Sequence, residues 1–366
     1  MSQVRLTVLV GPGLVADAAL LASSTAATCA ELDVAGGVVT AASADEMRAL
    51  LATADQPVVV LPGPTAAARA LIGAQPSGAV WYDLTVEPPV PGAVHLAGRG
   101  LWGLTWAIRH AVHRLRAPAT RIAYGPDPDQ WGDLRLPSTP DAGPAPVAVL
   151  LHGGFWRSIW GADLMDALAV DLAGRGSASW NLEYRRPDRH GWDATTQDVQ
   201  AGLLALREPA RDRMVDLDRI VVLGHSAGGQ LALRAAADLA ARTSGPRVAL
   251  AVSLAGVLDL TEGERRYLGD GAVAAALGGS PLTAPRRYAE SAPMLRLPTG
   301  VPTLLVQGTE DSLDLVDANR RYAAAAAAAG DEIRHLEQPG DHFAVIDPAS
   351  AVWQDTMTAV DGRLGR

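Results

Sequence analysis

The sequence contains one cysteine, Cys29, among its 366 residues. A single cysteine cannot form an internal disulfide, which is typical of proteins in a reducing compartment. The first five residues contain no apolar core of the kind a signal peptide needs, and no uninterrupted apolar stretch is long enough to span a bilayer. We therefore expect a cytoplasmic protein that does not enter a membrane, in which Cys29 is a small buried hydrophobic residue.

The sequence also contains fewer basic than acidic residues. The 31 basic residues are outnumbered by 40 acidic ones, which gives a formal net charge of -9, and no run of like charge stands out. Nucleic acids and anionic membrane surfaces therefore have no basic field to bind, so the expected partner is a soluble small molecule. The length exceeds that of one typical domain and predicts two or three. Obvious propeller repeats, which restrict entry in some oligopeptidases, are absent.

The first third of the chain alternates between strand-like and helix-like segments. Strands are expected at 4–10, 38–40, 57–61 and 79–84, and helical stretches at 44–52, 65–71 and 101–115. Such alternation predicts parallel strands in an α/β sandwich. We expect a flavodoxin-like three-layer domain over residues 1–117, with the boundary at 116–120, and an unrelated α/β domain is the alternative.

Four features of this third resemble type II dehydroquinase. They are Val-Gly-Pro-Gly-Leu at 10–14, Leu-Pro-Gly at 61–63, a strand ending near Asp83, and the Gly-rich turn at 98–100. The resemblance implies an arginine and a tyrosine on a mobile loop, an asparagine before Pro-Gly and a histidine after the next strand. Here the loop is shortened, Leu61 stands at the asparagine position and Asp83 at the histidine position. The domain is therefore expected to be non-catalytic and to serve in homo-oligomer assembly or in covering a second domain.

The chain is organised around Gly-His-Ser-Ala-Gly at 224–228. An apolar run at 220–223 leads into it, and residues rich in helix formers follow. This order is typical of a nucleophile elbow, where a serine occupies a strained strand-to-helix turn and flanking glycines allow close backbone approach. Ser226 is thus the predicted nucleophile, and an ordinary Gly-rich turn is the alternative.

A second motif, His-Gly-Gly-Phe-Trp at 152–156, follows the strand-like run 146–151. A pair of glycines at a strand end lets backbone N–H groups face a ligand, which is how one half of an oxyanion hole is built. We expect Gly154 and Phe155 to be the donors, with Gly153 as a near alternative, and the N–H of Ala227 to complete the hole. A simple tight turn is the alternative here.

A serine nucleophile needs a general base and a carboxylate that orients it, and candidates for both follow predicted strands. Asp311 comes after the run 302–307, and His342 lies in a loop after the run 333–336. The order Ser226, Asp311, His342 is that of α/β-hydrolases, in which the histidine is the general base and the carboxylate orients it. Glu310 and Asp314 are alternatives to Asp311. His152 and His225 are expected to be structural, and the Gly- and Pro-containing stretch 263–298 is expected to be an irregular lid.

From about residue 121 to its end, the chain resembles the kynurenine formamidase and carboxylesterase branch of the α/β-hydrolases. The resemblance rests on Tyr124-Gly125, on Asp-Leu-Arg-Leu-Pro at 133–137, on Tyr-Arg-Arg at 184–186 and on the two motifs above. It implies an α/β-hydrolase domain over 118–366 with a mostly parallel sheet, and hydrolysis of aryl formamides or of short-chain or aryl esters without a metal or organic cofactor.

Trp156 and Tyr184, with Trp160 nearby, are expected to line a pocket that accepts aromatic groups, and packing in the core or at a rim is the alternative. The sequence therefore predicts a serine hydrolase that cleaves a small ester or aryl formamide through an acyl-enzyme. Two alternatives stay open. One is a serine peptidase acting on small peptides, and the other is a non-catalytic binding or assembly protein.

Overall fold

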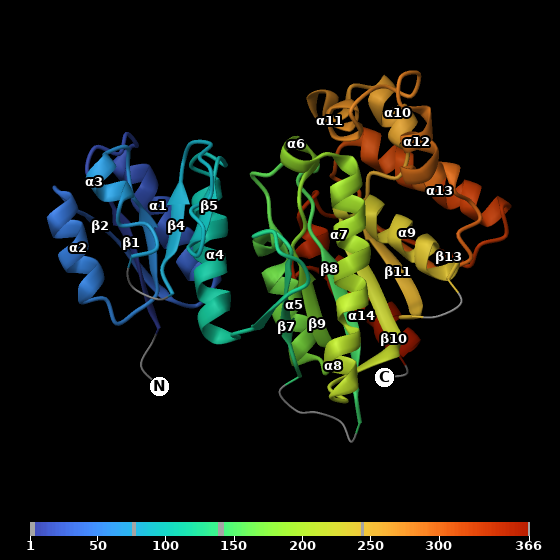
Figure 1. The fold of residues 1–366 in the computed structure, drawn as a ribbon, viewed down its shortest axis with the longest axis horizontal. Coiled ribbons are helices and arrows are strands. Elements are labelled where there is room, and N and C mark those ends of the chain that lie inside the picture. Colours follow the sequence, from blue (N-terminus) through green and yellow to red (C-terminus); the bar gives the residue numbers. More distant parts are fainter. Residues whose placement is uncertain (1–3, 75–77, 138–142, 243–244, 365–366) are drawn as a thin grey trace. The chain divides into compact units, whose positions relative to one another are not determined.

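The computed structural model describes residues 4–74, 78–137, 143–242 and 245–364. The first three residues, which contributed to the expectation about a signal peptide, lie outside these ranges. The chain divides into two compact units, Met1–Pro118 and Ala119–Arg366 (Figure 1). Each unit has a parallel or mostly parallel sheet and its own core, so each is described by itself.

The first unit contains a five-stranded sheet, parallel throughout, in the order β2-β1-β3-β4-β5. This is one of the common orders of doubly wound sheets. The strands are β1 (Arg5–Val10), β2 (Ala35–Thr40), β3 (Val58–Leu61), β4 (Val80–Asp83) and β5 (Val94–Ala97). The helices are α1 (Ala18–Glu31), α2 (Ala44–Ala52), α3 (Ala66–Arg69) and α4 (Gly103–Arg116).

Side chains of the first sheet alternate between two cores, because successive residues of a strand point to opposite faces. Val8 and Val59 pack with α1 and α4 on one face, whereas Leu9 and Val60 pack with α2 and α3 on the other. Cys29 of α1 is 1% exposed and belongs to the first of these cores, which confirms its prediction as a buried hydrophobic residue.

The second unit contains an eight-stranded sheet in the order β13-β12-β11-β10-β8-β9-β7-β6. Its strands are β6 (Thr120–Ala123), β7 (Trp131–Arg135), β8 (Ala145–Leu151), β9 (Ala178–Leu182), β10 (Val215–His225), β11 (Val248–Leu254), β12 (Thr303–Gly308) and β13 (Ile333–Gln338). All neighbouring strands from β9 to β13 are parallel, and only the pairings of β7 with β9 and β6 are antiparallel. The prediction of a mostly parallel sheet is confirmed.

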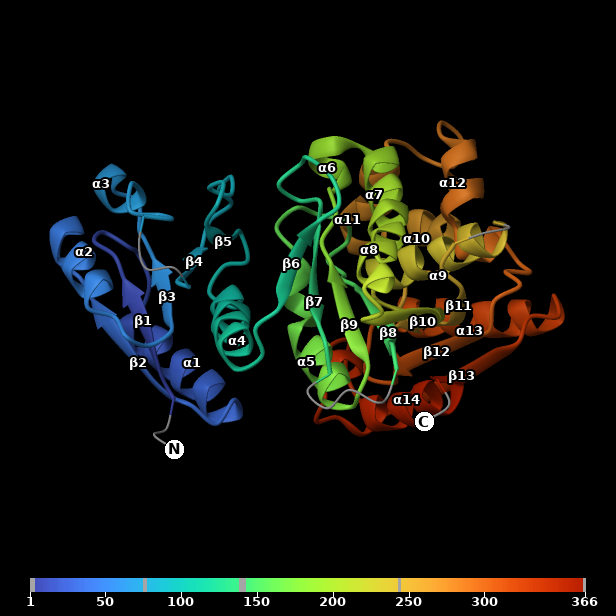
Figure 2. The ribbon, with the colours of Figure 1, turned by 60° about the horizontal axis from the view of Figure 1, so that its bottom comes forward.

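Helices cover both faces of this second sheet (Figure 2). They are α5 (Asp166–Gly174), α6 (Pro187–His190), α7 (Trp192–Ala205), α8 (Arg207–Arg211), α9 (Ala227–Ala240), α13 (Leu313–Ala328) and α14 (Ala351–Leu364), with short 3-10 turns at Ala162–Met165, Pro293–Leu295 and Ala344–Ile346. The side chains of α7, α9 and α13 share cores with β8, β10, β11 and β12, whereas α5 and α14 lie on the opposite face. No helix in the described ranges is long and apolar enough to cross a membrane.

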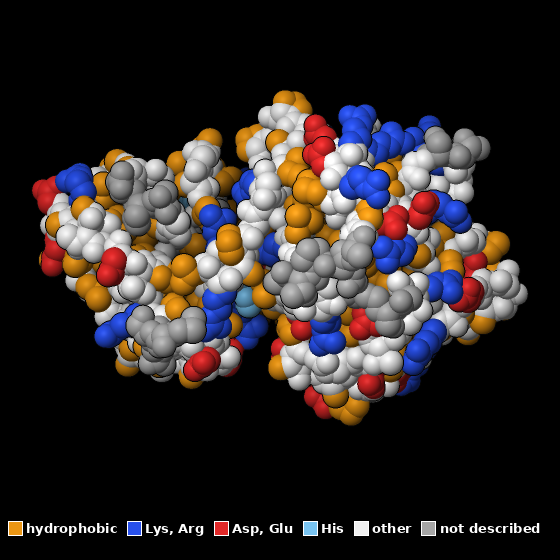
Figure 3. All heavy atoms as spheres, turned by 90° about the horizontal axis from the view of Figure 1, so that it is seen from below, with side chains coloured by type: hydrophobic (Ala, Val, Ile, Leu, Met, Phe, Trp, Pro, Cys, Tyr) orange, Lys and Arg blue, Asp and Glu red, His pale blue; other side chains and the backbone are white. Residues whose placement is uncertain are grey.

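Three short helices occupy most of the stretch expected to be an irregular lid. They are α10 (Leu260–Arg265), α11 (Leu268–Leu277) and α12 (Pro285–Ser291), which lie together in Figure 1. The expectation of irregular backbone was wrong, because most of the stretch is helical and the glycines at 269 and 271 lie in a left-handed turn within the bounds of α11. On the face shown in Figure 3, arginine side chains are interspersed with acidic and apolar ones among the described residues.

Candidate active site

Ser226 lies between β10 and α9 in a strained conformation, with φ 55° and ψ -119°. The glycines on either side are required by close packing. A Cβ at position 224 would lie 1.9 Å from the carbonyl oxygen of Gly228, and one at position 228 would lie 2.2 Å from that of Leu151. The strand, turn and helix are present as predicted. Positive φ in a non-glycine residue is a form of strain that surrounding structure has to maintain, and it is concentrated at functional sites.

The loop 152–156, here called the HGG loop, follows β8 and lies against Ser226. A Cβ at Gly153 would come within 2.8 Å of the His225 carbonyl oxygen and 2.9 Å of the Ser226 Cβ. Gly154, Phe155 and Trp156 have φ values of 108°, 49° and 57°, so three consecutive residues lie in the left-handed region. The structure therefore brings the predicted donor loop beside the serine.

Ala227 is the first residue of α9 and is fully buried. The first N–H groups of a helix have no acceptor within the helix itself, and the positive end of the helix dipole lies there. The N–H of Ala227 thus lies next to Ser226, where the second half of the oxyanion hole is predicted.

Asp311 and His342 meet beyond the carboxyl ends of β12 and β13. The imidazole Nδ1 of His342 donates to Asp311 Oδ2 at 2.8 Å. Gln307 Nε2 donates to the same oxygen at 2.9 Å, and the backbone N–H of Ser312 donates to Oδ1. Burial opposes ionisation, but the hydrogen bond from His342 and the others hold the pKa of Asp311 below its usual value. With Nδ1 protonated in this way, Nε2 of His342 is the ring nitrogen that accepts a proton.

The two alternatives to Asp311 lie elsewhere. Asp314 accepts from Arg266 at 2.9 Å and so is part of a surface ion-pair group, and Glu310 is exposed. Among the three acids, Asp311 is the one that the structure joins to His342.

His225 ties the loop of His342 to the serine turn. Its Nε2 donates to the backbone carbonyl of His342 at 3.0 Å, and the two imidazole rings lie 4.7 Å apart. Burial lowers the pKa of His225 to about 3, so the ring stays neutral and keeps this donor role at ordinary pH. Because His225 directly precedes Ser226, the contact brings Ser226, Asp311 and His342 to one end of the sheet.

His152 is held by a buried carboxylate that the sequence analysis did not single out. Its Nε2 contacts Glu183 Oε1 at 3.0 Å. Glu183 also accepts from Arg186 and from the backbone N–H groups of Ala162 and Tyr184, at 3.1 and 2.9 Å for the last two. Although burial opposes it, the charge of Arg186 lowers the pKa of Glu183 to about 2. The one available signal was an acid directly after the alternating apolar and polar residues 178–182, at the carboxyl end of a strand.

Trp156 and Tyr184 do not line a pocket, and this prediction was wrong. They are 1% and 0% exposed, because both side chains contact internal partners. Trp156 Nε1 donates to Gln230 Oε1 at 3.1 Å, whereas Tyr184 stacks on the His152 ring at 4.3 Å and donates from its hydroxyl to the His152 carbonyl at 2.8 Å. The core-packing alternative applies to both.

A loop at 266–271, here called the cap loop, lies against the HGG loop. Tyr267, Gly269 and Asp270 have φ near +60°, which is costly for the two non-glycine residues. Arg157 Nη2 donates to the Gly269 carbonyl at 2.8 Å, and a Cβ at Gly269 would lie 2.7 Å from the Phe155 ring. Phe155 is partly exposed, and its ring lies against the cap loop.

The other end of the cap loop is bound to α13. Arg266 pairs with Asp314 at 2.9 Å and with Asp317 at 2.8 Å. Two arginines therefore hold the cap loop. Arg157, which directly follows the HGG loop, binds its Gly269 carbonyl, and Arg266 of the cap loop binds α13.

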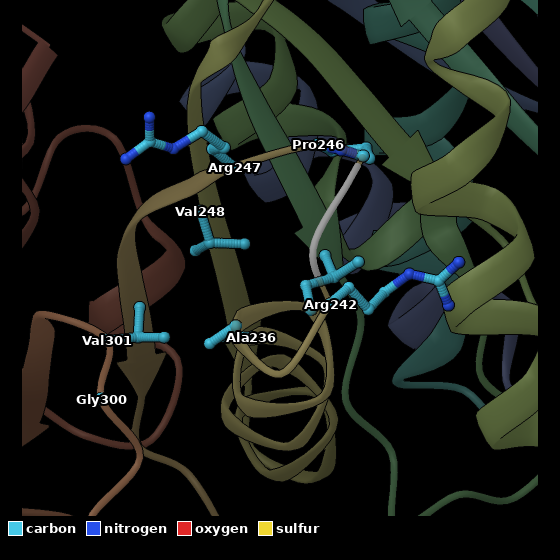
Figure 4. Close-up of a pocket in the computed structure, with 10 residues that line it drawn as sticks. Ala236, Arg242, Pro246, Arg247, Val248, Gly300 and Val301 are labelled. Atoms are coloured by element: carbon cyan, nitrogen blue, oxygen red, sulfur yellow. The ribbon is translucent and has the colours of Figure 1, made fainter.

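A cavity of about 430 Å³ lies near the amino end of β11, at the end of the sheet away from Ser226 (Figure 4). It is lined by the end of α9, by residues 245–248 at the start of β11, and by Gly300 and Val301. Ser226 instead follows the carboxyl end of β10. In Figure 4 the side chains of Arg242 and Arg247 point in different directions, so these two charges do not converge in the cavity.

Among the described residues, Asp127, Asp129 and His190 form the one group whose ligand atoms lie close enough to hold a metal ion. Asp129 is already paired with Arg186 at 3.0 Å, and Asp127 accepts from the backbone of Asp129 at 3.0 Å. These internal partners account for the arrangement, so we derive no chemistry from it.

The corresponding edge of the first unit is closed. Asp83, at the end of β4, binds Arg69 Nη1 at 2.8 Å and His95 Nε2 at 2.8 Å, and these hydrogen bonds lower its pKa against the effect of burial. Between β1 and β3, where doubly wound sheets usually bind ligands, the two following loops pack together. Gly11 N donates to the Leu61 carbonyl at 2.7 Å, and a Cβ at Gly11 would lie 2.2 Å from the Pro62 oxygen.

The sequence of the second unit matches a known family. Residues 133–321, which are 189 of the 366 residues, match the family model described as BD-FAE. The chain belongs to the BD-FAE family. The matched region begins within β7 and ends within α13, so it includes the HGG loop, Ser226 and Asp311.

Two curated relatives of this BD-FAE member come from Mycobacterium tuberculosis. Esterase LipC is 31% identical over 153 residues, which are 41% of this chain and 34% of LipC. Carboxylesterase NlhH is 35% identical over 102 residues, which are 28% of this chain and 31% of NlhH. The matched regions thus span about a third of the length of each relative.

Solved esterase structures share the fold of this BD-FAE member at lower identity. Esterase B of Lactobacillus rhamnosis superposes with a TM-score of 0.59 at 20% identity, covering 72% of this chain and 93% of that one. Bacterial heroin esterase gives a TM-score of 0.55 at 24% identity, covering 67% and 83%. The propionate-bound esterase Est2 of Thermogutta terrifontis gives 0.55 at 23% identity, covering 68% and 93%. At these identities the likeness concerns the fold.

Proposed function

We propose that this protein is a serine hydrolase that cleaves a small carboxylic ester or an aryl formamide. The observation that carries the proposal is the 2.8 Å hydrogen bond between His342 Nδ1 and Asp311, on a loop that His225 binds to the serine turn. A strained serine, an oriented imidazole and an ionised carboxylate form the set needed for nucleophilic catalysis. The esterase names of the relatives agree with this chemistry.

In the proposed reaction Ser226 Oγ attacks the carbonyl carbon while its proton moves to His342 Nε2. Asp311 stays ionised, because its pKa is lowered, and stabilises the imidazolium. N–H groups of Ala227 and of the HGG loop donate to the oxyanion. The bond to the leaving group then breaks, and the proton on His342 passes to the departing alcohol or amine. Water repeats the sequence on the acyl-enzyme, releasing the acid and restoring the serine.

A fluorophosphonate probe tests the nucleophile. We expect one covalent label per chain on the wild type and none on Ser226→Ala, with the two proteins showing the same circular dichroism spectrum. An unlabelled, folded wild type would contradict the proposal. Labelling that persists in Ser226→Ala would place the nucleophile elsewhere.

A substrate panel tests the chemical class. The panel contains p-nitrophenyl esters of increasing chain length, N-formylkynurenine and a short peptide amide. We expect short or aryl esters to be cleaved, and cleavage of N-formylkynurenine at a comparable kcat/KM would support the kynurenine formamidase branch. A higher kcat/KM for the peptide would favour the serine peptidase alternative.

For the first unit we propose a flavodoxin-like, dehydroquinase-like arrangement that is non-catalytic and supports homo-oligomers. The order β2-β1-β3-β4-β5 supports the arrangement, and the packed loops after β1 and β3 support the absence of a ligand site there. Light scattering of the full chain tests assembly. We expect a molar mass that is a multiple of 38.0 kDa, and a monomer at micromolar concentration would contradict this role.

A further inference from the structure

Gln230 lies on α9, one turn after Ser226, and both ends of its side chain are used. It is fully buried. Its Oε1 accepts from the indole Nε1 of Trp156 at 3.1 Å, and its Nε2 donates to the backbone carbonyl of Ser291 at 2.8 Å. A buried amide with this pair of partners joins three segments that are distant in sequence: the HGG loop, the nucleophile helix α9 and the cap helix α12.

The HGG-loop partner of Gln230, Trp156, lies in strained backbone. Trp156 is the last of three consecutive residues with positive φ and directly follows Phe155, a proposed oxyanion donor. Such conformations persist only where the surroundings impose them. The indole of Trp156 is 1% exposed and packs edge-on against Trp192 at 5.7 Å, so the hydrogen bond to Gln230 fixes a ring that is already enclosed.

At the α12 end, Ser291 is itself held in place. Its hydroxyl oxygen accepts from Trp192 Nε1 at 2.8 Å and from Arg234 Nη1 at 2.7 Å. Ser291 is fully buried and ends α12. Gln230 therefore connects the HGG loop to Ser291 of α12, a residue that two other side chains hold in place.

We propose that Gln230 is a positioning residue that keeps the two halves of the oxyanion hole in register. One half, the N–H of Ala227, belongs to α9, and the other belongs to the HGG loop. Gln230 sits on α9 and binds the loop through Trp156, so it sets the distance between the halves without touching substrate. The inference rests on the proposed function, because it concerns stabilisation of the oxyanion.

The kinetic signature follows from where the oxyanion forms. Charge develops on the carbonyl oxygen in the transition state, so a displaced donor lowers kcat and leaves ground-state binding nearly unchanged. Removing a whole donor costs on the order of 100-fold or more in kcat. A donor that is displaced but present is expected to cost about tenfold.

A double-mutant cycle tests the proposal. Trp156→Phe removes the indole N–H, Gln230→Met removes both amide groups, and the third variant combines them. On p-nitrophenyl butyrate we expect each single variant to lower kcat about tenfold with KM changed less than about twofold. The double variant is expected to be no worse than either single one, because one shared hydrogen bond is lost in all three.

Trp353→Phe is the matched control. Trp353 is also a buried tryptophan whose Nε1 donates to one side chain, Asp171 Oδ2, at 2.8 Å, but it lies on α14. We expect it to lose thermal stability as Trp156→Phe does, with kcat within about twofold of the wild type. Rates are expressed per fluorophosphonate-reactive site, so unfolded protein does not enter the comparison.

Three results would overturn the positioning role. They are an unchanged kcat in folded Trp156→Phe and Gln230→Met, losses that multiply in the double variant, or a loss in Trp353→Phe equal to theirs. A wild type that neither hydrolyses esters nor reacts with the probe would instead remove the proposed function itself.

Discussion

Each unit contains an Asp–His pair whose aspartate lies at or just beyond the carboxyl end of a parallel strand, and the two pairs differ in what the second ring nitrogen contacts. In the first unit, His95 Nε2 binds Asp83 at 2.8 Å and Nδ1 accepts from the Val90 N–H at 3.1 Å. Its side chain is 0% exposed. In the second unit, His342 Nδ1 binds Asp311 at the same distance, but the side chain is 24% exposed.

The difference shows that an Asp–His contact at a strand end is not by itself a catalytic signal. Asp83 and His95 are enclosed, and Arg69 pairs with the carboxylate, so removing one member would leave a buried polar group without its partner. Among the residues that the structure describes, no arginine donates to Asp311, and the backbone of His342 accepts from His225, the residue before the strained serine. Access and a neighbouring strained serine distinguish the second pair.

The largest expected effect comes from removing the charge of each carboxylate in turn. Asp311→Asn is expected to lower kcat by about 10⁴-fold, because the imidazole loses the partner that fixes its tautomer. Asp83→Asn is expected to leave kcat/KM for p-nitrophenyl esters within about twofold. Steady-state kinetics on both variants checks this, and a large loss in Asp83→Asn would show that the first unit takes part in hydrolysis.

The free energy of unfolding is expected to fall at low pH because of Glu183, the carboxylate that holds His152. Its pKa is lowered to about 2 in the folded chain, against 4.5 for an unperturbed group. Its stabilising contribution is therefore complete above about pH 4.5 and is lost as the pH falls toward 2. A shift of this size corresponds to about 3 kcal/mol in the free energy of unfolding.

Urea unfolding of Glu183→Gln between pH 2 and 7 measures this contribution. The variant is expected to be less stable at neutral pH and to show a flatter pH dependence below pH 4.5 than the wild type. Parallel curves for the two proteins would show that another group is responsible for the acid sensitivity.

Asp83→Asn is expected to destabilise the chain by about 2 kcal/mol at pH 7, since it removes the charge that pairs with Arg69 and replaces one of the two acceptor oxygens with a donor. Thermal unfolding with separate probes for the two units would localise the loss to the first one. Equal destabilisation by Asp311→Asn would contradict the contrast between a stabilising pair and a catalytic one.

The smallest expected effect concerns the cap loop. Gly269→Ala places a methyl group against the Phe155 ring at a backbone φ of +60°. We expect the ring to move and the preferred acyl length in the p-nitrophenyl panel to change by about threefold in relative kcat/KM, since one methylene in an apolar pocket alters specificity only modestly. Gly330→Ala, at φ +89° with open space around it, controls for the strain alone.

Sequence patterns predicted the parts of this molecule that depend on local order along the chain. Ser226 was identifiable because its glycines are adjacent in sequence, and Asp311 and His342 because polar residues follow apolar runs. Strand β5 (Val94–Ala97) was not predicted, since four residues of intermediate burial give no clear periodicity.

Other features depend on partners that are distant in sequence. Trp156 was assigned to a pocket because its acceptor, Gln230, lies 74 residues away and nothing near Trp156 indicates it. Glu183 was missed for the same reason, since its partners come from three segments of the chain. Helices α10, α11 and α12 were expected to be irregular, because glycine was taken as a residue that ends a helix. Gly269 and Gly271 instead lie in a left-handed turn.

The two arginines that hold the cap loop differ in how they respond to ionic strength. Arg266 and its acidic partners on α13 are solvent-facing ion pairs, which dissolved salt screens, whereas the bond from Arg157 ends on an uncharged carbonyl backed by an aromatic ring. Raising the salt concentration is therefore expected to weaken the contact of the cap loop with α13 before it weakens the contact with the HGG loop.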